Sequence, residues 1–247
     1  MPRTDVTVPT EDGDCRATLH TPSSPGARPA VLLYPDAAGA RETFAAMADR
    51  LAQLGYTVLL PDVYYRTGGY APFDPATALS DPAERERLFA LAGSLTTPMV
   101  LRDADAFLAF LAERPEVSTD RVGTTGYCMG GRTSLIVAGH RPDRVVAAAS
   151  FHGGGLADES DPDAPHRLAD RMGAHVLVAA AENDEHFPPE QFDRLERALI
   201  SAGVRHTMET YPAAHGFAVP DNPTHDEAAT ERHWSALAAL FATSLGG

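Results

Sequence analysis

The sequence predicts an α/β fold, in which a mostly parallel central sheet is flanked by helices on both faces. Short apolar runs alternate along the chain with longer segments of helical periodicity. Most of the apolar runs stop at glycine, proline or aspartate, as strands do before a turn. The hydrophobic share of 44% in 247 residues is enough for one sizeable core.

The alternation begins near residue 30. Ala30–Tyr34 is expected to be a buried strand ending at Pro35-Asp36, and Arg41–Leu54 has apolar residues at helical spacing. Tyr56–Leu60 is the next expected strand and Met99–Glu113 the next amphipathic helix. The remaining elements follow the same rule: strands at Arg121–Tyr127, Val145–Phe151, His175–Ala181 and Arg205–Tyr211, and helices at Arg132–Gly139 and Thr230–Leu245.

Two polar segments interrupt this alternation without dividing the chain. Residues 64–98 are rich in glycine, proline and aromatic residues, with a possible short helix at Pro82–Ala92, and residues 152–170 contain three consecutive glycines. Long excursions at strand ends often cover the active-site end of such a sheet, although they can also be plain solvated connections. We therefore expect a single domain over residues 1–247, with both excursions above its active-site end.

Composition limits the partners of this chain. The formal charge of −14 disfavours nucleic acid and anionic membranes, and no apolar run is long enough to span a bilayer. The polar N-terminus and the presence of only two cysteines favour a cytoplasmic protein, as a monomer or small homo-oligomer. All twenty basic residues are arginine, which excludes a lysine-dependent phosphate loop and Schiff-base chemistry.

The segment Gly126-Tyr127-Cys128-Met129-Gly130 carries the strongest chemical signal. It follows a predicted strand and precedes a predicted helix, which is the pattern of a nucleophile elbow with cysteine in place of serine. Small residues permit the tight turn, and the N-terminus of the helix favours a thiolate. The alternative is a buried structural cysteine beside a glycine-rich turn.

Two later residues could complete a catalytic triad with Cys128. Asp184 follows the predicted strand at 175–181, and His215 follows the last predicted strand. This order of nucleophile, acid and base is typical of such elbows, and His215 would exchange a proton with the thiol. Each residue alone could be a turn or loop residue. Met129 and Ala37 are the expected backbone donors of an oxyanion hole.

Together these residues resemble the dienelactone hydrolase family of α/β-hydrolases. Gly126–Gly131 is similar to its Gly-Tyr-Cys-x-Gly-Gly elbow, and Pro61–Arg66 to its Pro-Asp-Leu-Tyr-x-Arg segment. Asp184 and His215-Gly216-Phe217 match its acid and base positions, and the likeness extends from about Asp12 to the C-terminal helix. The family implies a Cys-His-Asp triad that hydrolyses an ester or lactone, as carboxymethylenebutenolidase does, without a cofactor.

The resemblance also implies further site residues. Asp36 stands where the family has a carboxylate that controls the thiol, although the archetype has the longer glutamate; alternatively Asp36 caps the next helix or shapes its loop. Arg85, or Arg87, would bind a substrate carboxylate unless it pairs on a solvated face. The family's second arginine is missing, because Ala218-Val219-Pro220 follows the base. Independently of the resemblance, aromatic residues could form the pocket walls, although aromatic residues in loops are also ordinary packing: Tyr64, Tyr65, Phe217, Tyr70 and Phe73.

The sequence therefore predicts a small-molecule ester or lactone hydrolase that forms an acyl-enzyme on Cys128. The alternative is a non-catalytic protein of the same fold that binds a ligand or senses oxidation through this thiol. Metal chemistry is disfavoured despite ten histidines, because neither Asp184-Glu185-His186 nor the stretch from Asp221 to His233 has a known ligand spacing.

Overall fold

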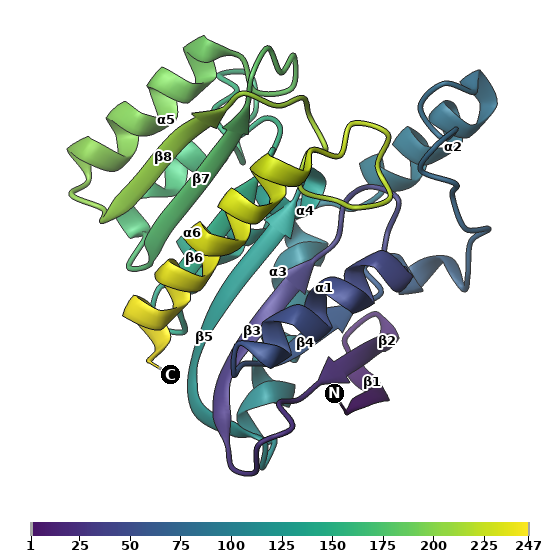
Figure 1. Cartoon of the computed structure of the whole chain (residues 1–247), viewed down its shortest axis with the longest axis vertical. Coiled ribbons are helices and arrows are strands. Elements are labelled where there is room, and N and C mark those ends of the chain that lie inside the picture. Colours follow the sequence, from purple (N-terminus) through teal and green to yellow (C-terminus); the bar gives the residue numbers. More distant parts are fainter. Residues whose placement is uncertain (1, 247) are drawn as a thin grey trace.

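A computed structural model describes residues 2–246, apart from the side chains of residues 119 and 120. Residues 1 and 247 of the expected domain lie outside these described residues. The chain forms an eight-stranded sheet in the order β1-β2-β4-β3-β5-β6-β7-β8 (Figure 1). Only the first two pairings, β1 with β2 and β2 with β4, are antiparallel. The strands are β1 (Arg3–Thr10), β2 (Gly13–His20), β3 (Arg28–Tyr34), β4 (Thr57–Pro61), β5 (Val117–Tyr127), β6 (Val145–Phe151), β7 (His175–Ala181) and β8 (His206–Tyr211).

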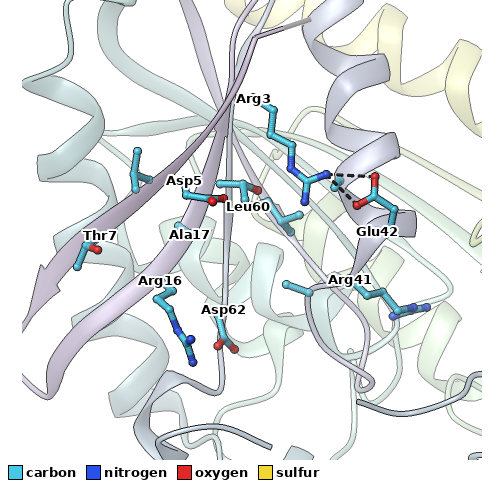
Figure 2. Close-up of a pocket in the computed structure, with 13 residues that line it drawn as sticks. Arg3, Asp5, Thr7, Arg16, Ala17, Arg41, Glu42, Leu60 and Asp62 are labelled. Carbon is cyan, nitrogen blue, oxygen red and sulfur yellow. Dashed lines mark hydrogen bonds and ion pairs between the residues drawn. The ribbon is translucent and has the colours of Figure 1, made fainter. Parts of the chain in front are cut away.

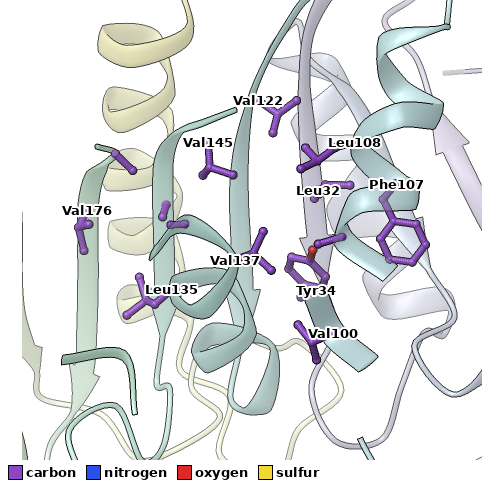
Figure 3. Packing of buried hydrophobic residues seen from close by; sticks show 14 of the residues in the cluster. Leu32, Tyr34, Val100, Phe107, Leu108, Val122, Leu135, Val137, Val145 and Val176 are labelled. Atoms are coloured by element: carbon purple, nitrogen blue, oxygen red, sulfur yellow. The ribbon is translucent and has the colours of Figure 1, made fainter. Parts of the chain in front are cut away.

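Helices cover both faces of the sheet. One apolar layer packs α1 (Glu42–Gln53) and α6 (Glu227–Leu245) on it, and the other packs α3 (Thr97–Ala112), α4 (Met129–His140) and α5 (Pro189–Ser201). The side chains of β3 alternate between the layers, because Leu32 and Tyr34 lie in the second and Val31 and Leu33 in the first. Figure 3 shows the second layer, where Leu32 and Tyr34 face Leu108, Val137 and their neighbours. The predicted α/β fold is confirmed.

The remaining helices lie in the two excursions. Helix α2 (Pro82–Gly93) occupies the first and stands apart from the sheet in Figure 1. Its N-terminus is capped by Asp81, whose Oδ1 accepts hydrogen bonds from the N–H groups of Ala83 and Glu84 at 2.8 and 3.1 Å. Short 3₁₀ turns η1 (Tyr65–Thr67) and η2 (Pro165–Arg171) complete the excursions. No helix within residues 2–246 is long and apolar enough to cross a membrane.

Two parts of the fold differ from the sequence prediction. The hairpin β1–β2 was not expected, because β1 is a mostly exposed edge strand with little apolar alternation. Helix α5 was also missed, although Phe192, Leu195 and Leu199 have helical spacing. Helix α4 begins at Met129 rather than at Arg132, so that Cys128 directly precedes its first turn.

The junction of β5 and α4 depends on a close approach of backbones. A Cβ atom added at Gly126 would lie 2.0 Å from the carbonyl oxygen of Gly130. One added at Gly130 would lie 2.3 and 2.4 Å from the carbonyl oxygens of Tyr34 and Pro35. The two glycines therefore let the helix start pack against β5 and the end of β3 without steric overlap.

We predict that Gly130→Ala lowers the free energy of unfolding by about 1–3 kcal/mol, because the backbone must move to admit the methyl group. Gly93→Ala is the matched control, since a Cβ atom there meets nothing within 4 Å, and its effect should stay within about 0.5 kcal/mol. Urea unfolding of both variants measures the difference. Equal stability of the two would contradict the packing described for the junction.

Candidate active site

Cys128 sits where the chain turns from β5 into α4. Its φ and ψ angles are 53° and −119°, in a region that side-chain-bearing residues rarely adopt. The turn is held by its own backbone groups, because the Cys128 N–H donates to the Phe151 carbonyl at 3.1 Å and its carbonyl accepts from the Gly131 N–H at 3.0 Å. The thiol therefore projects from a fixed, strained turn at the N-terminus of a helix, where the helix dipole favours a negative charge.

Parallel strand order brings the other functional side chains to the same edge of the sheet. Asp36, Cys128, Asp184 and His215 each follow the carboxyl end of a strand, namely β3, β5, β7 and β8. In parallel sheets these ends lie together, and ligands bind there. Residues as far apart in the sequence as Asp36 and His215 therefore meet around one cavity.

Asp184 and His215 form a buried acid–base pair. His215 Nδ1 donates to Asp184 Oδ2 at 2.7 Å, and the His186 N–H donates to Oδ1 of the same carboxylate at 2.9 Å. The Asp184 side chain is only 1% exposed. Burial is the largest single influence and would raise the pKa of Asp184, but the hydrogen bonds from His215 and the His186 N–H, together with the charges of the two rings, hold the pKa below its usual range. The carboxylate therefore stays charged and fixes the orientation of the imidazole ring.

His215 interacts with both Asp184 and Cys128. Burial would lower the pKa of His215, but its hydrogen bonds with Asp184 and Cys128 outweigh burial and raise the pKa to about 10. With Nδ1 bound to Asp184, the Nε2 atom is left for the sulfur. The ring is thus stabilised as an imidazolium beside Cys128.

The two expected oxyanion donors lie on the same cavity. Ala37 and Met129 both line it, and neither N–H has a hydrogen-bond acceptor among residues 2–246. Tyr64 joins their two loops, because its hydroxyl donates to the Ala37 carbonyl at 2.9 Å and lies 3.4 Å from Met129 Sδ. Tyr64, expected as a pocket wall, is buried behind the donors and holds them in position.

Asp36 lines the cavity but its carboxylate is bound elsewhere. The Arg41 guanidinium donates to both of its oxygens, at 2.7 and 2.9 Å, and to both oxygens of Asp221, at 2.7 and 2.8 Å. The Ala38 N–H donates to Asp36 Oδ1 at 2.9 Å. Asp36 therefore shapes the loop after β3, and no hydrogen bond within residues 2–246 joins it to the thiol.

The cavity above Cys128 has a volume of about 300 Å³, which suits a small ligand. Cys128, Met129, Ala37, Asp36 and His215 contribute to its floor, and residues 75–92 of the first excursion form one wall. Four further polar residues, which the sequence did not suggest, also line it: Arg132, His152, His186 and Asn222.

His152 and His186 flank His215. Their ring centroids lie 5.1 and 5.0 Å from that of His215. His152 has a φ of 40° and is 1% exposed, and neither of its ring nitrogens has a hydrogen-bond partner in the described chain. Burial lowers the pKa of His152 well below its usual range, so that the ring is neutral. An unpartnered neutral imidazole beside the base is available to a ligand.

The other expected substrate contacts lie away from the cavity lining. Arg85 is exposed on α2. The Tyr65 hydroxyl donates to Asp103 Oδ1 at 2.8 Å and lies 2.6 Å from the Thr10 hydroxyl of β1. Phe217 is fully buried and packs behind His152, with ring centroids 5.1 Å apart. The structure thus brings the triad and oxyanion residues together, and it does not bring Arg85, Tyr64, Tyr65 or Phe217 into their cavity.

A second and larger cavity, of about 460 Å³, lies beside the N-terminal strands (Figure 2). It is lined by β1, β2, β4 and the start of α1, and Arg3 pairs there with Glu42 at 2.8 Å. Its described lining has no cysteine, serine or histidine. Among the described residues, the cavity above Cys128 therefore differs from this larger one in the reactive side chains that line it.

Comparison with known proteins agrees with this geometry. A model of the dienelactone hydrolase family matches residues 15–245. A Salmonella typhi protein, provisionally named a carboxymethylenebutenolidase, is 30% identical over 242 residues, which are 96% of this chain and 86% of that protein. The carboxymethylenebutenolidase of Rhodococcus opacus is 26% identical over 227 residues, which are 90% of this chain and 84% of that enzyme.

A solved structure shares the whole architecture. The dienelactone hydrolase-like promiscuous phosphotriesterase P91, from metagenomic libraries, matches over 100% of both chains with a TM-score of 0.78 and 27% sequence identity. The family match covers nearly the entire chain, including the elbow and both partners of its cysteine. This chain therefore belongs to the dienelactone hydrolase family of α/β-hydrolases.

Proposed function

We propose that this protein hydrolyses a carboxylic ester or lactone through a thioester on Cys128. The observation that carries the proposal is the chain of contacts in which Asp184 binds His215 Nδ1 at 2.7 Å while His215 meets the strained Cys128 thiol. Sulfur attacks the carbonyl carbon, and the Ala37 and Met129 N–H groups stabilise the oxyanion that forms. The intermediate then collapses, the carbon–oxygen ester bond breaks, and His215 gives its proton to the leaving alkoxide.

The second half of the reaction restores the enzyme. Neutral His215 accepts a proton from a water molecule, whose oxygen attacks the thioester carbon. Collapse of that intermediate releases the carboxylic acid and the Cys128 thiolate, so that the imidazolium–thiolate pair is present again. One water is consumed for each ester bond broken. With a lactone, the alkoxide stays attached to the acyl group and the product is a hydroxy acid.

The thiolate also limits the range of substrates. A thiolate is a better leaving group than an amide nitrogen, so the tetrahedral adduct of an amide returns to substrate more readily than it breaks down. Activated esters and lactones are therefore preferred to peptides, and we place the enzyme among small-molecule hydrolases of the cytoplasm.

We predict that Cys128→Ala lowers kcat/KM for p-nitrophenyl hexanoate by at least about 10³-fold, because no covalent route remains. His215→Gln and Asp184→Asn should each lower it by about 10²–10⁴-fold, through loss of the proton carrier or of its orientation. His225→Gln is the matched control, since His225 is exposed on a loop. Steady-state hydrolysis measures all four variants. Undiminished turnover in Cys128→Ala would refute the thiol mechanism and favour the ligand-binding alternative.

The raised pKa of His215 predicts a pH-dependent contribution to stability. Since the folded pKa of about 10 lies above the ordinary value of 6.5, the protonated ring stabilises the fold. This contribution is complete below pH 6.5 and is lost as the pH rises through about 10. The difference in unfolding free energy between the wild type and His215→Gln should therefore shrink over this window.

Urea unfolding at several pH values tests this second prediction, with His225→Gln again as the control. The control's stability difference from the wild type should not follow the same window. A difference for His215→Gln that grows with pH would contradict the assigned imidazolium.

A further inference from the structure

One wall of the active-site cavity is apolar and open to solvent. Its side chains come from the first excursion, and they are Pro75, Ala78, Leu79, Leu88, Phe89 and Ala92. Leu79 and Phe89 are each 52% exposed, unlike the other large apolar residues of this wall. A ligand with an apolar group would remove this surface from water, which gives the wall a role in binding.

The single arginine on the cavity is already neutralised. Arg132 Nη2 lies 2.7 Å from Asp161 Oδ2, and its Nη1 donates to the Gly155 carbonyl at 2.9 Å. The Asp163 carbonyl accepts a further hydrogen bond at 3.3 Å. The guanidinium is thus held by the second excursion, and its charge is offset before any substrate enters.

Three other cations near the cavity are also engaged by acidic groups. Arg87 on α2 pairs with Glu84 at 2.6 Å and lies over the Phe73 ring at 3.6 Å from its centroid. Arg41 is shared by Asp36 and Asp221. The His215 imidazolium faces Cys128 and Asp184. None of these positive charges is left to pair with an anionic substrate group at the apolar wall.

One buried polar group of the cavity suits an uncharged ligand. His152 lines the cavity as a fully buried ring, and both nitrogens lack a partner within residues 2–246. A buried polar group without a partner is costly, and a bound molecule can supply the missing hydrogen bond. A neutral imidazole can donate to a neutral carbonyl or ether oxygen without having to offset a full charge.

We infer that the cavity selects an uncharged ester or lactone, whose apolar part lies against Leu79 and Phe89, and discriminates against a carboxylate at that position. The inference rests on the proposed function, because it concerns the substrate of the same site. Its physical basis is the cost of removing an unpaired carboxylate from water onto an apolar wall.

Three esters of one chain length test this selectivity. They are p-nitrophenyl hexanoate, the mono-p-nitrophenyl ester of adipic acid, in which a carboxylate replaces the terminal methyl, and the methyl ester of that monoacid. With uncatalysed hydrolysis subtracted, the two neutral esters should have similar kcat/KM, and the carboxylate ester a value at least about tenfold lower. Turnover of the carboxylate ester equal to that of its methyl ester would overturn the inference.

A charge variant tests the reason for the discrimination. Asp161→Asn leaves the Arg132 guanidinium without its carboxylate partner, so the ratio of kcat/KM for the carboxylate ester to that for the hexanoate should rise severalfold. Asp170→Asn is the matched control, because it removes the same charge from the same excursion at an exposed position. An unchanged ratio in Asp161→Asn would contradict the neutralisation of Arg132.

Binding to the Cys128→Ala variant separates this inference from the proposed mechanism. Calorimetry with the same three esters should show tighter binding of the two neutral ones, whether or not the thiol carries out the chemistry. Ester turnover that persists in Cys128→Ala would overturn the mechanism alone. Equal affinity for the neutral and carboxylate esters, or no binding of any of them, would overturn the selectivity.

Discussion

The strained turn at Cys128 is the constraint on which the rest of the site depends. A φ of 53° at a cysteine is held in place by β5, by α4 and by the Phe151 carbonyl. Gly126 and Gly130 permit this turn because a side chain at either position would overlap the neighbouring backbone. The turn fixes three things together: the place of the sulfur, the direction of the helix dipole, and the Met129 N–H beside the reacting carbon.

A second constraint is electrostatic. Asp184 is almost completely buried, and the hydrogen bond from His215 keeps it charged. That charge in turn stabilises the imidazolium of His215 next to Cys128, so side chains that follow β7 and β8 set the electrostatic surroundings of the thiol that follows β5. The other charged side chains of the cavity are paired, because Asp36 binds Arg41 and Arg132 binds Asp161. The charged groups of the site are therefore paired with one another, and little positive charge is left to bind an anionic substrate.

The sequence revealed those features that are local or that topology enforces. The elbow is a contiguous pattern, and strand ends in a parallel sheet must meet, which is why the sequence could predict that Cys128, Asp184 and His215 lie together. Partners set by long-range packing could not be found in this way. The guanidinium of Arg132 turns toward the second excursion, and His152 reads in the sequence as the start of a polar loop. For the same reason, the sequence could not show that Tyr64 and Phe217 pack behind the cavity rather than line it.

Direct detection of the acyl-enzyme tests the central claim most closely. Trypsin cleaves after Arg121 and Arg132, so one peptide, Val122–Arg132, contains Cys128 and no other cysteine. After a rapid acid quench of the reaction with p-nitrophenyl hexanoate, mass spectrometry should find the hexanoyl group on Cys128 in this peptide. Turnover without that adduct, or with the hexanoyl group on another residue, would contradict a reaction through the Cys128 thioester.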